Sequence, residues 1–507
     1  MQASSRVVLN TIAQYVRTII NIVLSLITVR IVLRTLGVED FGIYSLIAGV
    51  VSMLTFVTGA LATTTQRYIS YYQGVNNLKI LKDVFANSFL IHLGLGIIVF
   101  VVLASIAPLL FNGFLNIPPD RNSAAVYVYF CVISMVLITF ACSPFKALCV
   151  AHENIVFNSV IDVLDGIIKL VLVLLMVYIP WDKLVYYGLT LLFVQIINLV
   201  IFLTYCGNKY KECVWPKLSY IRGKYIKGML SFAGWNIYST GCWVGRQQGV
   251  AIVLNKMMSA TVNAAYGVGF HISSYTNFLA NAIAAAIQPQ IVMNEGAGDR
   301  EKALWLTSIS CKFSFFLTAM VVVPCIFEID SILKLWLGDV PEYTSLFCVM
   351  ALSASLFNSL TGSLGHINQA VGNIKMYSIL TNTPKLLTIP FAWLALYINM
   401  SLVWLVVIYV LIEFVCSWIR IPFIHRTASL DIAMFVKNVL LPEIVPTFLC
   451  VTTCFACSKM LDFKFDFILT FALSFIIYSF SIYKWGLTPR EKDILLKIAI
   501  RIKSFKK

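Results

Sequence analysis

Charged residues are scarce in this sequence. Only 12% of its 507 residues are Asp, Glu, Lys or Arg, and 60% belong to the apolar set. Ordinary globular domains are about 25% charged and roughly 45–50% apolar. A soluble fold of this composition would leave a large apolar surface in water. The composition therefore excludes a soluble protein and indicates a chain that lies mostly within a lipid bilayer.

The sequence also lacks the common signatures of nucleotide, metal and nucleic-acid binding. It contains no GxxxxGK[ST] motif, so ATP hydrolysis within this chain is not expected. The 13 cysteines lie almost entirely inside apolar runs, where a thiol packs as a small hydrophobic group. The basic residues behind the net charge of +15 fall in short loops and tails, not on a soluble face with interleaved aromatics. We expect no metal, no cofactor and no nucleic-acid partner.

What the sequence does contain is a nearly continuous series of apolar runs. A bilayer core is about 30 Å thick and is crossed by roughly 20 helical residues, so each run of that length is a candidate span. The fold class predicted is an all-α polytopic membrane protein of about fourteen transmembrane helices. The predicted spans are 9–32, 41–62, 84–110, 124–142, 155–179, 184–206, 229–254, 264–287, 305–328, 343–364, 375–398, 401–419, 444–461 and 463–485.

The distribution of Lys and Arg predicts the orientation, because cytoplasmic loops collect positive charge. The basic connection 208–228 and the tail 487–507 both become cytoplasmic if the N-terminus is inside. An even number of spans then leaves both termini in the cytoplasm. Thr488, Pro489 and Glu491 form the signature of a helix start, so the tail is predicted to be a basic amphipathic helix on the inner leaflet.

Weak internal similarity predicts a duplicated bundle. Short matches recur at offsets of about 220 residues, such as Ile31–Leu33 with Ile252–Leu254. Two copies of six spans share one orientation and form two pseudo-symmetric lobes around a central cavity, followed by two further helices. The predicted divisions are an N-lobe at 1–207, the connection 208–228, a C-lobe at 229–421, the last two spans within 422–486 and the tail 487–507.

Polar residues inside spans are the candidate functional residues, since a charge at the bilayer centre costs about 3 kcal/mol on insertion scales and normally faces an interior cavity or a partner. Polar residues follow one face of spans one, seven and eight. The candidate substrate-binding residues, with the cation of span eleven, are Gln14, Arg17, Asn21, Asn236, Arg246, Asn277, Asn281 and Lys385. Interhelical hydrogen bonding without substrate contact is the alternative role for the uncharged members.

The remaining charges allow two readings. Asp162, Asp165 and Lys169 lie on one face of span five, where Asp165 and Lys169 are spaced for an intrahelical pair. One carboxylate of Asp162, Asp165 and Glu413 could instead exchange H⁺ or Na⁺ as the cavity alternates. Lys312 is expected to extend its ammonium to the membrane face. Cations outnumber acids within the spans, which favours an anionic substrate.

Two stretches resemble a known family. They are LNTIAQYVRTIINIVLSLITVRIVLRTLGVEDFGIYSL at 9–46 and SPFKALCVAHENIVFNSVIDVLDGIIKL at 143–170. The chain resembles polysaccharide flippases of the Wzx type, within the multidrug/oligosaccharidyl-lipid/polysaccharide exporter superfamily. The resemblance extends over the whole chain in span count and duplication. The chain differs from the related multidrug antiporters in having about fourteen spans instead of twelve, and Arg17 instead of an acid in span one.

The resemblance implies export of an undecaprenyl-diphosphate-linked oligosaccharide across the inner membrane of a bacterium by alternating access, for O-antigen, capsule or exopolysaccharide synthesis. It implies that Arg17 and Arg246 hold the anionic lipid diphosphate and glycan. The partners expected are this lipid-linked oligosaccharide, membrane lipids, a polysaccharide polymerase and chain-length machinery. No covalent step, and hence no enzyme, is expected.

Three alternative functions remain open at this point. Two belong to the same superfamily: a flippase for the peptidoglycan precursor and a cation-coupled multidrug exporter. The third is a polytopic glycosyltransferase or polymerase, in which Glu39 and Asp40 of the first outer connection would bind a metal or act as a base. Such enzymes are expected to carry a large outer loop or domain, and the predicted outer connections are all short.

Overall fold

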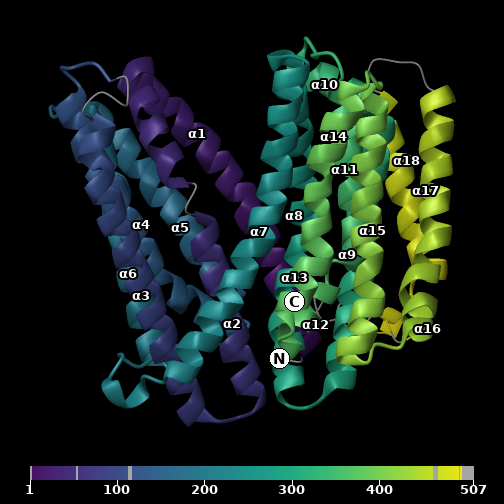
Figure 1. The fold of residues 1–507 in the computed structure, drawn as a ribbon, viewed down its shortest axis with the longest axis horizontal. Helices are drawn as coiled ribbons and strands as arrows, with labels where there is room; N and C mark the ends of the chain where they lie inside the picture. Colours follow the sequence, from purple (N-terminus) through teal and green to yellow (C-terminus); the bar gives the residue numbers. More distant parts are fainter. Residues whose placement is uncertain (1–2, 53–54, 112–116, 461–465, 490, 494–507) are drawn as a thin grey trace, which may run out of the picture. The chain divides into compact units, whose positions relative to one another are not determined.

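The computed structural model describes residues 3–52, 55–111, 117–460, 466–489 and 491–493 (Figure 1). Helices and short turns make up these ranges, and they contain no β-strand. Within the same ranges, nine helices are long and apolar enough to cross a membrane by length and composition. The prediction of an all-α polytopic membrane protein is confirmed.

The chain forms two compact units, each described by itself below. One unit comprises residues 8–237, and the other comprises residues 238–507 together with residues 1–7. The boundary after Ile237 lies inside a helix, α7 (Gly223–Met257), which begins within the predicted basic connection 208–228. The lobe divisions read from the sequence remain a prediction.

The unit of residues 8–237, called the N-unit below, is a bundle of long helices. α4 and α6 pack closely, because Gly188 of α6 lies where a β-carbon would be 3.3 Å from Cγ2 of Val128 in α4. A small residue lets two membrane helices approach in this way. The helices are α1 (Ala3–Ser52), α2 (Thr55–Gly74), α3 (Leu78–Leu109), α4 (Asn122–Ala151), α5 (Ile155–Leu175), α6 (Lys183–Lys209) and the start of α7 (Gly223–Met257).

The first two predicted spans are joined at a kink instead of a loop. Gly37 interrupts α1 with φ 82° and ψ 172°, a conformation that glycine adopts at little cost because it has no side chain. The kink falls between the predicted spans 9–32 and 41–62. The sequence therefore located the break correctly, and a single non-helical residue, Gly37, makes the turn in place of a loop.

The unit of residues 238–507, called the C-unit below, contains the rest of α7 and the remaining helices (Figure 1). Gly269 of α8 lies beside α11, where a β-carbon would be 2.7 Å from the carbonyl oxygen of Phe347. The helices are α8 (Ala260–Gly296), α9 (Arg300–Phe327), α10 (Ile329–Leu337), α11 (Thr344–Thr361), α12 (Leu364–Val371), α13 (Ile374–Asn382), α14 (Thr388–Tyr397), α15 (Leu402–Ala428), α16 (Ile432–Phe435), α17 (Leu441–Met460) and α18 (Asp466–Ser481).

Two prolines change the predicted spans of the C-unit. Predicted span 375–398 is divided into α13 and α14 by a 3₁₀ turn, η4 (Thr383–Leu387), which contains Pro384. Proline lacks an N–H and so interrupts the helical hydrogen-bond ladder. The span predicted at 444–461 begins earlier, because a π-helical turn, η5 (Val436–Leu440), accommodates Pro442 and joins α16 to α17. Glu443, expected at a boundary, is consequently buried within the helix.

The predicted helix start in the C-terminal tail is confirmed. The backbone N–H of Thr488 donates to Oε2 of Glu491 at 2.7 Å, and the N–H of Glu491 donates to Oγ1 of Thr488 at 3.4 Å. These are the reciprocal bonds of a capping box. The amphipathic remainder of the predicted tail helix, 494–507, lies outside the described residues.

Candidate functional site

Three charged side chains meet in the N-unit and are called the N-unit cluster: Arg17 of α1, Lys146 of α4 and Asp162 of α5. Nη1 of Arg17 lies 2.8 Å from Oδ2 of Asp162, and Nζ of Lys146 lies 3.2 Å from Oδ1. The side chains of Arg17, Lys146 and Asp162 are 29%, 39% and 27% exposed, respectively. The cluster carries one more positive than negative charge and is accessible from outside the protein interior.

Close packing of α1 against α5 brings Arg17 to Asp162. Gly166 of α5 faces α1, where a β-carbon would be 2.9 Å from Cδ1 of Leu24. The amide of Asn10 donates to the carbonyl oxygen of Glu153 at 2.8 Å, which fixes the start of α1 beside the connection between α4 and α5. Because these contacts flank the cluster along both helices, the local sequence holds the Arg17 guanidinium at the carboxylate.

The sequence did not indicate Lys146 as a candidate, because span four was predicted to end at residue 142. In the structure α4 continues to Ala151, through Pro144, and places Lys146 on the same carboxylate as Arg17. The available signal was a lysine directly after Phe145 in an otherwise apolar run. A longer span four would have counted it among the intramembrane cations.

Asp165 and Lys169 form the intrahelical pair that their spacing predicts. Nζ of Lys169 is 2.6 Å from Oδ2 of Asp165, and the amide of Asn198 donates to Oδ1 of Asp165 at 2.6 Å. Both carboxylate oxygens therefore have partners within the N-unit. A coupling role for Asp165 or Asp162 stays a prediction.

A second group, called the C-unit cluster, consists of Arg246 of α7, Lys385 of η4 and Glu413 of α15. Nη1 of Arg246 lies 2.7 Å from Oε2 of Glu413, and Nζ of Lys385 lies 2.7 Å from Oε1. These side chains are only 4%, 6% and 3% exposed, in the order Arg246, Lys385, Glu413. The Arg246 guanidinium also lies 4.1 Å from the ring centroid of Tyr409. The two cations share one carboxylate in a dry interior.

The other predicted substrate-binding residues lie in varied environments. Gln14 is buried in α1 at 7% exposure. Asn21 is half-buried, and its Oδ1 atom has no hydrogen-bond partner. Asn236 is half-buried in the part of α7 that belongs to the N-unit, and Asn281 is exposed. The side chain of Asn277 lies outside the described residues.

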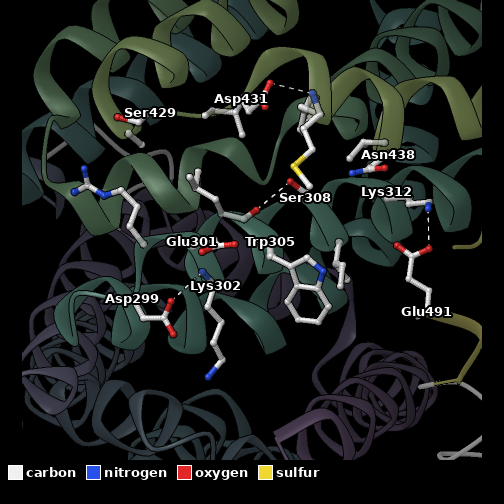
Figure 2. Close-up of a pocket in the computed structure, with 18 residues that line it drawn as sticks. Asp299, Glu301, Lys302, Trp305, Ser308, Lys312, Ser429, Asp431, Asn438 and Glu491 are labelled. Carbon is white, nitrogen blue, oxygen red and sulfur yellow. Dashed lines mark hydrogen bonds and ion pairs between the residues drawn. The ribbon is translucent and has the colours of Figure 1, made fainter. Parts of the chain in front are cut away.

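A recess of about 650 Å³ lies at one end of the C-unit, between α9, the turn after α15, η5 and the start of the tail (Figure 2). At one side of it, Nζ of Lys312 pairs with Oε2 of Glu491 at 2.8 Å. The expectation that Lys312 extends to the membrane face is wrong: Lys312 is 1% exposed, because Glu491 of the tail covers its ammonium group. The recess is lined by residues of both charges and suggests no single ligand.

Outside the predicted spans, an arginine joins three connections of the N-unit. Arg121 donates to Oδ1 and Oδ2 of Asp40 at 2.7 and 2.5 Å and to Oδ2 of Asp182 at 2.6 Å. Burial by itself would raise the pKa of Asp182, but the bonds from Arg121 and from two backbone amides hold that pKa below its usual value. Since both Asp40 oxygens accept from Arg121, the carboxylate that the enzyme alternative needs is already engaged.

Comparison with known proteins gives one family match and a set of structural neighbours. Residues 7–295, more than half of the chain, match the family described as "Polysaccharide biosynthesis protein". No curated protein matches.

Within the described ranges no group of three or more His, Cys, Asp and Glu residues is arranged to hold a metal ion.

The structural neighbours are transporters. A crystal structure of a MATE point mutant is 15% identical, with a TM-score of 0.71, and the alignment covers 85% of this chain and 97% of that one. MATE in the bent conformation is 14% identical, with a TM-score of 0.73, and 85% and 96% of the two chains are covered. A MOP superfamily transporter from Pyrococcus furiosus is 14% identical, with a TM-score of 0.69 and the same coverage. These similarities establish the fold.

Proposed function

The chain belongs to the polysaccharide biosynthesis protein family and has the fold of MOP superfamily transporters, and on this premise we propose that it is a flippase for a lipid-linked oligosaccharide. The substrate is an oligosaccharide on undecaprenyl diphosphate, moved from the inner to the outer leaflet of the bacterial inner membrane. Transport proceeds by alternating access, without a covalent step. The product then serves a polysaccharide polymerase and its chain-length machinery.

The observation that carries this proposal is the accessible positive charge of the N-unit cluster. Counting at 1.5 Å per residue, Arg17 lies about 12 Å along the helix from the start of the first apolar run. Charged side chains at such depth normally face the helix-bundle interior or a water-filled cavity and not lipid. Arg17 and Lys146 are 29% and 39% exposed, so a ligand can reach them.

The chemistry of this cluster suits a diphosphate. An arginine binds phosphate oxygens through two parallel N–H donors, and a lysine binds them as a compact point charge. Asp162 holds both cations in place when no ligand is bound. An arriving diphosphate competes with this carboxylate for the same two groups, which lets binding be reversible.

The N-unit cluster argues against one of the two alternative functions within the superfamily but not against the other. A cationic drug would meet Arg17 and Lys146 with Asp162 already neutralised by them, so the N-unit cluster disfavours the multidrug exporter alternative. The peptidoglycan precursor carries the same diphosphate, and the cluster does not discriminate against it. The glycan is therefore selected by residues other than this cluster.

Leaflet transfer in proteoliposomes tests the proposal. The vesicles contain a short oligosaccharide on polyprenyl diphosphate, and an added enzyme modifies only sugars on the outer surface. We expect modification to rise well above the half that is exposed at the start. Arg17→Ala and Lys146→Ala should each slow transfer by about 10- to 100-fold. This factor corresponds to the free energy that one hydrogen bond to a charged group contributes.

The matched control is Lys169→Ala. Lys169 is 31% exposed, similar to Arg17, and pairs with Asp165 on the same helix as Asp162. We expect this variant to transfer the lipid at nearly the wild-type rate. Modification that stays at one half with wild-type protein would contradict the flippase proposal. Parallel vesicles with a peptidoglycan precursor or a fluorescent cationic drug then identify which alternative applies.

A further inference from the structure

The break in predicted span eleven places a lysine in the buried interior of the C-unit. Pro384 interrupts the helix, and the resulting turn η4 carries Lys385 between α13 and α14. The side chain of Lys385 is 6% exposed, and its Nζ atom lies 2.7 Å from Oε1 of Glu413. A primary amine is therefore held in a dry site by the unwound segment of a membrane helix.

The charges around this amine do not balance. Glu413 already accepts from Arg246 at 2.7 Å. Arg420, one further buried cation on α15, donates to neutral groups, with its Nη2 atom 2.8 Å from Oδ1 of Asn358. Three cations thus stand near one carboxylate. Burying a charge without a partner is costly, so this excess disfavours the fully charged state.

The other groups that face Lys385 do not supply the missing negative charge. Tyr409 lies under the Arg246 guanidinium, and Cys416 lies on α15 between Glu413 and Arg420. From α7, the hydroxyl of Tyr238 is 2.7 Å from Oγ1 of Thr383 in the same turn as Lys385. Phenols and thiols are neutral near pH 7. Among the residues that the structure describes, Glu413 is the one carboxylate that faces Lys385.

Only one proton movement brings this cluster closer to neutrality. Arginine does not lose its proton in proteins, and protonation of Glu413 would increase the excess positive charge. Loss of a proton from Lys385 leaves Arg246 and Glu413 as a one-to-one pair. Lysine changes its charge readily when it is buried, which arginine does not.

We propose that Lys385 is the residue that binds the coupling proton during transport. The amine takes up a proton when the C-unit opens to water and releases it when the cluster closes as in this structure. Glu413 and Arg246 then act as positioning residues that define the closed state. This inference rests on the proposed transport function. It assigns the coupling of transport to the H⁺ gradient to the amine of Lys385, and not to one of the carboxylates considered from the sequence.

The first test needs no transport substrate. Hydrogen–deuterium exchange of segment 374–397 is measured in the full-length protein at a mildly acidic and a mildly alkaline pD, with times corrected for intrinsic exchange. We expect the wild-type segment to exchange at least severalfold faster at acidic pD, because a protonated Lys385 opposes closure. In Lys385→Gln the exchange rate of this segment should no longer differ between the two pD values. In Lys385→Arg the segment should exchange fast at both pD values.

The control is Lys375→Gln, which changes an exposed lysine on the adjoining helix α13 and should behave as wild type. Exchange in the wild type that is independent of pD, or a pD dependence that persists in Lys385→Gln, overturns the proposal. The Lys385→Arg variant keeps the test valid if the amide variant is poorly folded, since it retains a cation of similar length.

The second test links the proton to the substrate in uniformly oriented proteoliposomes. For one proton per lipid, a gradient of one pH unit shifts the ratio of outward- to inward-facing lipid by about tenfold. We expect this shift in wild type and in Lys375→Gln, and no response to the gradient in Lys385→Gln. If the lipid does not move in wild type while exchange still depends on Lys385, the flippase proposal fails and the proton site stands.

Discussion

Each of the two units contains a cluster of one arginine, one lysine and one carboxylate, but the N-unit cluster is partly exposed and the C-unit cluster is buried. Each cluster has two cations on one carboxylate: Arg17 and Lys146 on Asp162 in the N-unit, Arg246 and Lys385 on Glu413 in the C-unit. The three N-unit side chains are 27–39% exposed, whereas those of the C-unit are 3–6% exposed. The difference lies in how far the protein covers the charged groups, not in the charges.

Because of this difference in exposure, we expect the two clusters to have different functions. An accessible ion pair is worth little in stability and can exchange its partner for a ligand. A buried pair cannot lose one partner without leaving an unpaired charge in a medium of low dielectric constant. We therefore assign substrate binding to the N-unit cluster, and conformational stability with proton binding to the C-unit cluster.

Removing the shared carboxylate should have the largest effect. Glu413→Gln leaves the buried Arg246 guanidinium without its anion, and we expect a loss of about 3–5 kcal/mol in the free energy of unfolding. Asp162→Asn, the matched change in the N-unit, should cost less than about 1 kcal/mol because water solvates Arg17 and Lys146. Thermal unfolding of the purified proteins in detergent measures both. Equal losses would show that the two clusters do not differ in kind.

Exchanging arginine for lysine sharpens the comparison. Arg246→Lys keeps the charge but loses the planar stack on Tyr409, and should cost about 1–2 kcal/mol of stability. Arg17→Lys should leave stability unchanged and slow lipid transfer by less than about tenfold, because the single charge remains while the two-pronged grip on phosphate is lost. A Tm that falls as far for Arg17→Lys as for Arg246→Lys would contradict the assignment.

Salt should affect one cluster more than the other. Charges that water reaches are screened over about 10 Å at 0.1 M salt and about 3 Å at 1 M, whereas buried pairs are screened much less. We expect lipid transfer to slow severalfold across this range, while the loss of stability in Glu413→Gln stays constant. Transfer rates and melting temperatures measured over the same salt series check this. Transfer that is insensitive to salt would argue against an electrostatic substrate site.

The smallest effect is expected outside the spans, at the Arg121 connection of the N-unit. Arg121 holds the pKa of Asp182 below its usual value, so this pair stabilises the folded state above about pH 4 and its contribution is lost as the pH falls further. Because Asp182 is 34% exposed, solvent screening limits the effect to less than about 1 kcal/mol. Comparison of unfolding at neutral and acidic pH for wild type and Arg121→Gln isolates it, and the acid sensitivity should be smaller in the variant.

The sequence predicted the class of fold and the location of most spans because bilayer thickness fixes the length of each apolar run. It did not predict features that depend on local backbone chemistry. Pro384 divides span eleven and brings Lys385 to Glu413, and the π-helical turn before Pro442 extends span thirteen. Neither consequence can be read from hydropathy alone.

The candidate residues were predicted individually, but their partners were not. Arg17 and Asp162 are 145 positions apart, and Arg246 and Glu413 are 167 positions apart. Sequence spacing identifies neighbours on one helix, as for Asp165 and Lys169, but carries no direct information about contacts between helices. The same limit explains why Arg246 was predicted to contact substrate although it lies buried against Glu413 and Tyr409. Its role in substrate binding stays a prediction.

The most direct test compares Arg17→Ala with Arg246→Ala in the same leaflet-transfer assay, with rates expressed per folded protein. We expect Arg17→Ala to melt at nearly the wild-type temperature and to transfer the lipid about 10- to 100-fold more slowly, since it loses a charged hydrogen bond to the diphosphate. Arg246→Ala should melt at a much lower temperature because its deletion weakens a buried pair. A folded Arg17→Ala protein that transfers lipid at the wild-type rate would contradict substrate binding by the N-unit cluster.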